Sequence, residues 1–281
     1  YTATLMQGSG TFSVESTIGS VVPRDGKLLV ISNGAYGDRI VKITRTLGID
    51  FIDLDHGEKL SPDLERIRQT LSEDSSITDV AMVHCETTTG MLNPVADIGQ
   101  VVKDHDCCYI VDAMSSLGGV PLTMEALQAD YLVASANKCV QGVPGFGFVI
   151  ARQQAIESIR GQARSLSLDL HDQWQEMESK QGKWRFTSPT HTVCAFAEAL
   201  VELKIMLEDL VMFHGLKADK TTRFAAKDLR QAAVKHRKFL ADFFTIRDAN
   251  GTRVPGKVIR VNDMAIADEG TFQTELMKQQ V

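Results

Sequence analysis

The sequence has few cysteines, few aromatic residues and no surplus of basic charge. Its 5 cysteines are odd in number and contain no CxxC pair, so neither a disulfide framework nor a zinc site is expected. Thiols without such a pattern are typical of the reducing cytoplasm, where we expect the protein to reside. The net charge of -6 argues against binding to nucleic acid or to an anionic membrane.

Long apolar runs are also absent. Polar residues interrupt the apolar stretches well short of the roughly 20 residues that a membrane-spanning helix needs. Hydrophobic residues nevertheless make up 43% of the chain and charged residues 23%, a composition typical of a globular protein with a sizeable core. We therefore expect one large domain or two unequal domains.

Short runs of Val, Ile, Leu and Cys recur along the first two thirds of the chain and alternate with amphipathic stretches. Continuous apolar runs predict strands that are buried on both faces, and helical crossovers are what parallel strands require. An α/β domain with a mostly parallel sheet between helices is therefore expected over residues 1–190. The expected strands are residues 1–7, 27–31, 80–83, 108–111, 131–134 and 146–150.

Three helix boundaries carry local signals. Ser61 with Pro62, and Asn93 with Pro94, are expected to be the N-cap and first-turn residues of two helices. Gly48 is expected to end a third helix that begins near residue 38.

The pattern changes after residue 189. Residues 190–210 predict a long helix with its apolar residues on one face. These residues are Val193, Phe196, Leu200 and Leu203. We expect residues 191–281 to form a helical connector and part of a smaller α/β C-terminal domain. Because the chain opens at Tyr1 inside an expected strand, we also expect a preceding N-terminal arm to be missing from the sequence.

Polar motifs follow the expected strands, at the sheet edge where ligands bind in α/β proteins. The first is GSGT at 8–11, which would place free N–H groups and two hydroxyls at a helix start and so favours an anion such as phosphate. An ordinary glycine turn is the alternative. The motif also resembles a dinucleotide fingerprint, but Ser32, Asn33 and Gly34 follow the second strand where a ribose-binding acid is required, which disfavours NAD.

Two further junctions offer side chains for a ligand. Tyr36 follows the second strand, where its ring would stack on a planar ligand or pack at the edge of the core. The string HCETTTG at 84–90 sets a run of polar side chains directly after another strand. That run favours ligand binding modestly over a loop that caps its own backbone.

Asp112 and Lys138 carry the strongest chemical signal. A carboxylate at a buried strand end is costly unless a cation or a strong donor faces it, so Asp112 predicts a partner such as a protonated ring nitrogen; an N-cap or a surface ion pair is the alternative. Most lysines are solvated, but a lysine between desolvating walls, as expected for Lys138, loses its proton and forms imines. Their 26-residue separation allows one crossover and one strand, which predicts neighbouring strand ends.

Taken together, the motifs resemble the fold-type I pyridoxal-phosphate aminotransferases of class V. The matching strings are MQGSGT, SNGAYG, MVHCETTTGMLNP, IVDAMSSLGG, SANKCVQGVPGF, RSLSLDLHDQW and GKWRFTSPTHT, over about residues 1–200. The last two narrow the resemblance to the 2-aminoethylphosphonate:pyruvate aminotransferases. The implied fold is a large cofactor-binding domain followed by a smaller α/β domain.

The resemblance implies pyridoxal 5'-phosphate as the cofactor and assigns roles around its ring. Lys138 would form the Schiff base and Asp112 would pair with the pyridine nitrogen, which makes these two the catalytic residues. Tyr36 would stack on the ring, and Thr87 would bond its phenolic oxygen.

The resemblance also implies how the phosphate and the substrate are held. Ser9, Gly10 and Thr11 would bind the phosphate of the cofactor, and Thr187 would reach the phosphate of the neighbouring subunit's cofactor, so that the site is complete in a homodimer. Arg260 is a weak candidate for the substrate-binding arginine, since an exposed arginine is the ordinary alternative. No metal is implied.

The implied reaction is amino transfer from 2-aminoethylphosphonate to pyruvate, which gives phosphonoacetaldehyde and L-alanine in phosphonate catabolism. Alanine:glyoxylate and serine:pyruvate aminotransferases, or a lyase on the same scaffold, are alternatives within the cofactor class. An NAD-binding Rossmann dehydrogenase and a non-catalytic protein of the same fold are alternatives outside it.

Overall fold

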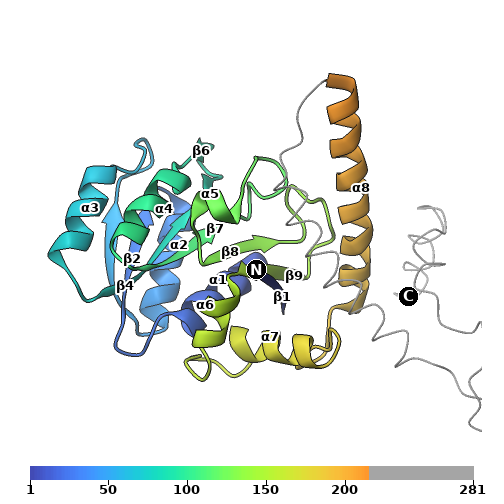
Figure 1. Ribbon diagram of the computed structural model, residues 1–281, viewed down its shortest axis with the longest axis horizontal. Coiled ribbons are helices and arrows are strands. Elements are labelled where there is room, and N and C mark those ends of the chain that lie inside the picture. Colours follow the sequence, from blue (N-terminus) through green and yellow to red (C-terminus); the bar gives the residue numbers. More distant parts are fainter. Residues whose placement is uncertain (215–281) are drawn as a thin grey trace, which may run out of the picture.

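The sheet is the central layer of the molecule, with helices on both of its faces (Figure 1). The computed structural model describes residues 1–214, and side chains as far as residue 203. Seven strands pair in the order β1-β9-β8-β7-β4-β2-β3. All pairs from β3 to β8 are parallel, and β9 is antiparallel to both of its neighbours. The predicted α/β domain with a mostly parallel sheet is confirmed.

The elements alternate along the chain as the sequence predicts. The strands of the large sheet are β1 (Thr2–Gln7), β2 (Lys27–Ser32), β3 (Asp50–Asp55), β4 (Ile77–Val83), β7 (Cys108–Asp112), β8 (Tyr131–Ser135) and β9 (Phe146–Ala151). Strands β5 (Cys85–Glu86) and β6 (Met91–Leu92) form a separate two-stranded sheet. The helices are α1 (Gly10–Val21), α2 (Ala35–Thr46), α3 (Leu64–Glu73), α4 (Val95–Asp104), α5 (Met124–Leu127), α6 (Gln153–Ser158), α7 (Leu170–Ser179) and α8 (Thr190–His214).

Each of the six expected strands corresponds to a strand of the large sheet, but sequence reasoning missed β3. This strand lies at the edge and pairs with β2 alone. Leu54 is its one buried side chain, and acidic residues occupy its exposed positions. An edge strand of this kind lacks the continuous apolar run that marks strands buried on both faces.

The helix boundaries required three corrections. Helix α3 begins at Leu64 rather than at Pro62, because the carboxylate of Asp63 is the N-cap and accepts the N–H groups of the first turn. In α4 the N-cap is Pro94, one residue later than predicted. Helix α2 begins at Ala35, three residues earlier than expected, and ends just before Gly48, whose φ of 64° is the left-handed conformation that closes helices.

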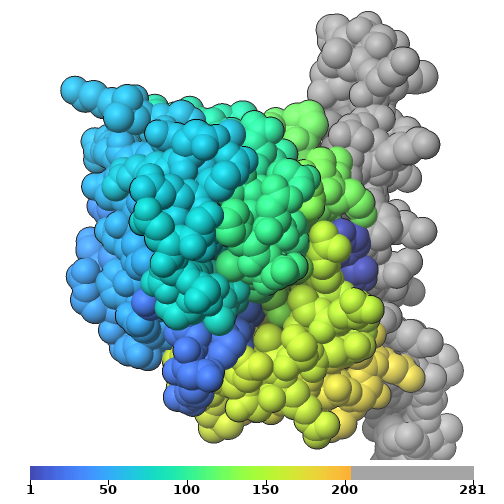
Figure 2. Space-filling model, turned by 60° about the vertical axis from the view of Figure 1, so that its left-hand side comes forward, coloured from blue at the N-terminus to red at the C-terminus, as the bar shows by residue number. Residues whose placement is uncertain are grey.

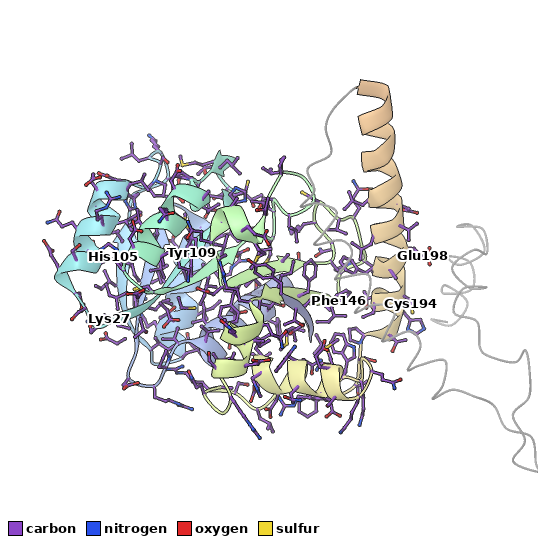
Figure 3. The ribbon with its side chains drawn as sticks, viewed as in Figure 1. Lys27, His105, Tyr109, Phe146, Cys194 and Glu198 are labelled. Atoms are coloured by element: carbon purple, nitrogen blue, oxygen red, sulfur yellow. The ribbon has the colours of Figure 1, made fainter. Side chains whose placement is uncertain are left out.

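The side chains of the sheet alternate between two apolar layers. In β2, Leu29 and Ile31 face a layer that also contains residues of α3 and α4, whereas Leu28 and Val30 face the layer of α1 and α2. The first turns of α8 belong to the former layer, in which the four apolar residues predicted for its face are all buried. The Phe196 ring packs edge-on to Phe146, with 5.2 Å between the ring centroids. Figure 3 labels Phe146 beside α8.

The docking of α8 bears on the predicted domain boundary at residue 190. Its first half contributes to the core of the large domain, so the helix is continuous with that domain at its start. Residues 215–281 lie outside the described part of the chain. A separate C-terminal domain over 191–281 therefore stays a prediction.

Helix α7 covers β1, from which it is far removed in sequence. Its Gln173 Nε2 donates to the Leu5 carbonyl oxygen at 3.2 Å, and Trp174 Nε1 donates to Thr2 Oγ1 at 3.2 Å. Figure 1 shows α7 in yellow, and Figure 2 shows the yellow-green segment that precedes it in the chain beside the dark blue N-terminal residues. Part of the string RSLSLDLHDQW therefore serves to dock this helix.

Asp79 is a buried carboxylate near the start of β4, with an exposed fraction of 2%. It accepts a hydrogen bond from Thr78 Oγ1 at 2.5 Å, and no lysine, arginine or histidine among the described residues forms an ion pair with it. Burial raises its pKa from 3.8 to about 6. The ionised form is therefore disfavoured in the folded state.

We expect Asp79→Asn to stabilise the protein at about pH 8 and to have little effect at about pH 4. The folded-state pKa lies above the unfolded one, so stability is lost as the pH rises from 3.8 to about 6 and stays low above that. At about 1.4 kcal/mol per pH unit, Asn should recover about 1–3 kcal/mol. Urea unfolding at both pH values tests this, with the exposed Asp25→Asn as the control. An equal gain at both pH values would contradict it.

Candidate active site

The loops that follow β1, β2, β4, β7 and β8 are joined by side-chain contacts at the carboxyl edge of the sheet. Arg39 connects the first two loops, because its guanidinium lies 4.5 Å from the centroid of the Tyr36 ring and donates to Thr11 Oγ1 at 3.4 Å. Glu86 connects the second loop to the third. The structure thus brings residues from these predicted junctions to one edge.

The turn between β1 and α1 has the features of an anion site. Ser9 is the N-cap of α1, but its hydroxyl makes no capping hydrogen bond, which leaves the N–H groups of the first turn without a side-chain acceptor. Gly8 has a φ of 105° and donates its N–H to the Gly145 carbonyl oxygen at 3.0 Å. A Cβ at Gly10 would strike the side chain of Met114, which would have to move to make room for it.

Asp112 ends β7 with an exposed fraction of 6%. Its Oδ1 accepts the N–H of Met114 at 2.9 Å, and no lysine, arginine or histidine of the described residues forms an ion pair with it. Burial, followed by the charge of Glu86, raises its pKa to about 6, against the lowering effects of the Met114 N–H and of Arg39. The surface ion pair considered from the sequence is therefore excluded within the described residues.

Lys138 lies on the turn after β8, the parallel neighbour of β7, as its spacing from Asp112 predicts. Its carbonyl oxygen accepts the N–H of Gln141 at 2.8 Å, and its side chain is exposed. The expectation of desolvating walls around this lysine is wrong for the described residues, because the turn lies at the surface and they do not cover it. Cys139, the next residue, donates to the Ser115 carbonyl oxygen at 3.4 Å and so joins this turn to the loop after β7.

Thr87 lies on the loop after β5 and is exposed. Its hydroxyl is 2.6 Å from that of Ser115. This contact joins the loop after β4 to the loop after β7, close to Asp112. His84, in the same string, is buried, and its Nδ1 lies 2.8 Å from Ser116 Oγ.

Sequence reasoning missed Arg39, Ser115 and the special position of Glu86. Arg39 lies three residues after Tyr36 on α2, a spacing that places two side chains on one helix face. That spacing was the available signal. The contacts of Ser115 and Glu86 join residues more than 25 positions apart, and nothing local predicts them.

Two residues implied by the resemblance are not joined to this edge. Thr187 is exposed in the segment between α7 and α8, and no hydrogen bond between described residues links it to the loops above. Arg260 lies outside the described residues.

The described residues also border a cavity of about 340 Å³ at the opposite, amino edge of the strands. Asp130 borders this cavity but already forms ion pairs with Lys103 and Arg152, at 2.6 and 3.3 Å. None of the residues predicted for the site borders it. The predicted chemistry therefore belongs to the carboxyl edge.

Two further kinds of site are absent from the described part of the chain. Among residues 1–203, whose side chains are described, His, Cys, Asp and Glu nowhere gather in a group that could hold a metal ion. No helix within residues 1–214 has the length and apolar character needed to span a membrane.

Comparison with known proteins identifies the family of this chain. The model of the family described as "Aminotransferase class-V" matches residues 13–234. A 2-aminoethylphosphonate–pyruvate transaminase of Syntrophobacter fumaroxidans is 62% identical over 203 residues, which cover 72% of this chain and 55% of the relative. The enzyme of the same name from Bacillus cytotoxicus is 58% identical over 204 residues, 73% of this chain and 56% of the relative.

Solved structures share the fold at lower identity. An alanine–glyoxylate aminotransferase from Nostoc sp. has a TM-score of 0.66 at 23% identity, covering 85% of this chain and 59% of that chain. A subgroup IV aspartate aminotransferase from Thermus thermophilus has a TM-score of 0.66 at 24% identity, covering 74% and 57%. These structures establish the fold as that of the fold-type I aminotransferases.

The chain spans about half the length of the relatives it matches in sequence. The family match covers most of the chain and includes every described residue of the carboxyl edge after position 12. The NAD-binding dehydrogenase is left without support. The chain belongs to the class V aminotransferase family.

Proposed function

We propose that the protein is a pyridoxal-phosphate-dependent aminotransferase that transfers the amino group of 2-aminoethylphosphonate to pyruvate, giving phosphonoacetaldehyde and L-alanine. The observation that carries the cofactor assignment is Asp112, a buried carboxylate that the described residues leave without a cation. A protonated ring nitrogen would supply that charge. The names of the most similar relatives support the choice of substrates.

The residues present fit this cofactor. The uncapped first turn of α1, with Ser9, Gly10 and Thr11, would hold its phosphate. The Tyr36 ring would lie against its ring face, and Thr87 would donate to its phenolic oxygen. When bound, pyridoxal phosphate supplies an electron sink for the substrate carbon that loses a proton.

The catalytic work of the chain itself falls to two side chains. Asp112, ionised above its pKa of about 6, would keep a proton on the ring nitrogen. Lys138 Nζ would hold the cofactor covalently between turnovers and, once released by the substrate amine, take the proton from the amine-bearing carbon. Its exposed position after β8 leaves it accessible to both tasks.

We also propose a homodimer in the cytoplasm. The exposed Thr187, with Phe186 beside it at 43% exposure, is consistent with a segment that contacts a second copy of the chain. Thr187 would then complete the phosphate site of the partner. The absence of disulfides from the described residues is compatible with a reducing compartment.

We expect Lys138→Ala to abolish turnover, with a loss of at least about 10²–10⁴-fold, because the proton carrier is removed. The measurement is the visible absorption of the full-length protein with pyridoxal phosphate, before and after 2-aminoethylphosphonate and then pyruvate. The exposed Lys59→Ala is the control. In the wild type, the visible absorption band of the bound cofactor should bleach when 2-aminoethylphosphonate is added and return when pyruvate is added.

Other outcomes separate the parts of this proposal. Bleaching by alanine or serine but not by 2-aminoethylphosphonate would reject the proposed donor and favour the related aminotransferases. An identical band and turnover in Lys138→Ala would reject the role of the lysine.

We expect the affinity for pyridoxal phosphate to fall on the acid side of about pH 6, where Asp112 of the cofactor-free protein becomes protonated. Because burial raises this pKa, the carboxylate is available above about pH 6 and is lost below it. Asp112→Asn should weaken binding about tenfold or more at neutral pH and remove this acid limb. Fluorescence titration against the exposed Asp38→Asn control tests this. Unchanged affinity and pH dependence in Asp112→Asn would contradict it.

A further inference from the structure

Glu86 is the most deeply buried carboxylate at the carboxyl edge, with an exposed fraction of 0%. Its Oε2 accepts the backbone N–H groups of Tyr36 at 3.1 Å and Gly37 at 3.2 Å, which belong to the first turn of α2. Its Oε1 accepts the hydroxyl of Thr88 at 3.0 Å. The carboxylate thus joins the loop after β4 to the helix after β2.

The start of α2 stabilises this buried charge. No lysine, arginine or histidine among the described residues forms an ion pair with Glu86. The N–H groups at a helix N-terminus and the helix dipole favour a negative charge there. Glu86 therefore occupies the N-terminus of α2, whereas the first turn of α1 has no side-chain cap.

Gly34 makes room for this arrangement. A Cβ at position 34 would strike Cγ of Glu86 and would lie 2.7 Å from its Cδ. The φ of Gly34 is 162°, an extended conformation open to any residue. The glycine is therefore required by the space that Glu86 occupies rather than by backbone conformation.

Glu86 also lies between two residues assigned to the cofactor. The next residue in the chain, Thr87, has its hydroxyl hydrogen-bonded to that of Ser115, on the loop after β7. The Tyr36 backbone is held by Glu86, and its ring is held by Arg39. Glu86, the residue that precedes Thr87, therefore links this loop to the backbone at Tyr36.

We propose that Glu86 is a positioning residue that fixes Tyr36 relative to Thr87 for cofactor binding. This role rests on the proposed function, because it assumes that Tyr36 and Thr87 contact pyridoxal phosphate. Removing the carboxylate would free the first turn of α2 from the loop after β4. Tyr36 would then lose its fixed position relative to Thr87.

The test measures the dissociation constant of pyridoxal phosphate with the full-length protein. Glu86→Ala should weaken binding about tenfold or more, since two charge-assisted hydrogen bonds are lost. Glu86→Gln should restore most of the affinity, because its amide oxygen still accepts the N–H groups. The exposed Glu73→Ala should match the wild type. Equal affinity in Glu86→Ala and the wild type would overturn the proposal.

Gly34→Ala gives an independent perturbation of the same contact. Alone, it should weaken binding to a similar extent, because the added Cβ displaces the Glu86 carboxylate. In the Glu86→Ala background it should cost less than about twofold more, since the atoms it would strike are gone. Additive losses would overturn the coupling between the two residues. If Glu86→Ala folds poorly, Gly34→Ala alone still tests the contact, and an affinity equal to that of the wild type would then overturn the proposal.

A Tyr36→Ala background separates positioning from a general structural effect. If Glu86 acts through Tyr36, adding Glu86→Ala should weaken binding less than about twofold in that background. A full tenfold loss there would show that the effect bypasses Tyr36 and would reject the proposed role. If the wild type binds no pyridoxal phosphate, the proposed function fails as well. If the wild type and Glu86→Ala bind it equally well, only the role of Glu86 is rejected.

Discussion

The structure depends on how it accommodates two buried carboxylates at the carboxyl edge of the sheet. Glu86 is satisfied within the chain, because two N–H groups at the start of α2 and the hydroxyl of Thr88 point at it. Asp112, on the neighbouring loop system, receives one backbone N–H and feels the repulsion of Glu86. The first carboxylate is therefore a structural tie between loops, and the second is the group that calls for a positively charged ligand.

The scaffold explains why these groups meet. Strands β2, β4, β7 and β8 are consecutive in the sheet and parallel, so their carboxyl ends deliver four loops to one edge. Helix α7 packs against β1. In the segment before α7, Arg164 donates to carbonyl oxygens at and just beyond the C-terminal end of α1, including that of Pro23 at 2.9 Å. Strings that mark the family thus include residues that hold the scaffold as well as residues at the site.

Much of this arrangement follows from local patterns in the sequence. Continuous apolar runs predicted the strands buried on both faces, and the spacing of Asp112 and Lys138 predicted neighbouring strand ends, which β7 and β8 confirm. The edge strand β3 was not predicted because exposed acidic residues interrupt its apolar residues. The exposure of Lys138 and the tie made by Glu86 escaped because both depend on contacts between segments distant in the chain, for which the sequence offers no periodic signal.

The isolated charge of Asp112 also bears on how long a molecule survives. A folded chain that buries a carboxylate without a counter-charge is less stable than the same chain with that charge neutralised by a bound cation. Under the proposed function, newly made chains would open more often than loaded ones and expose more cleavable backbone to proteases. Supply of the cofactor would then govern the abundance of the protein as well as its activity.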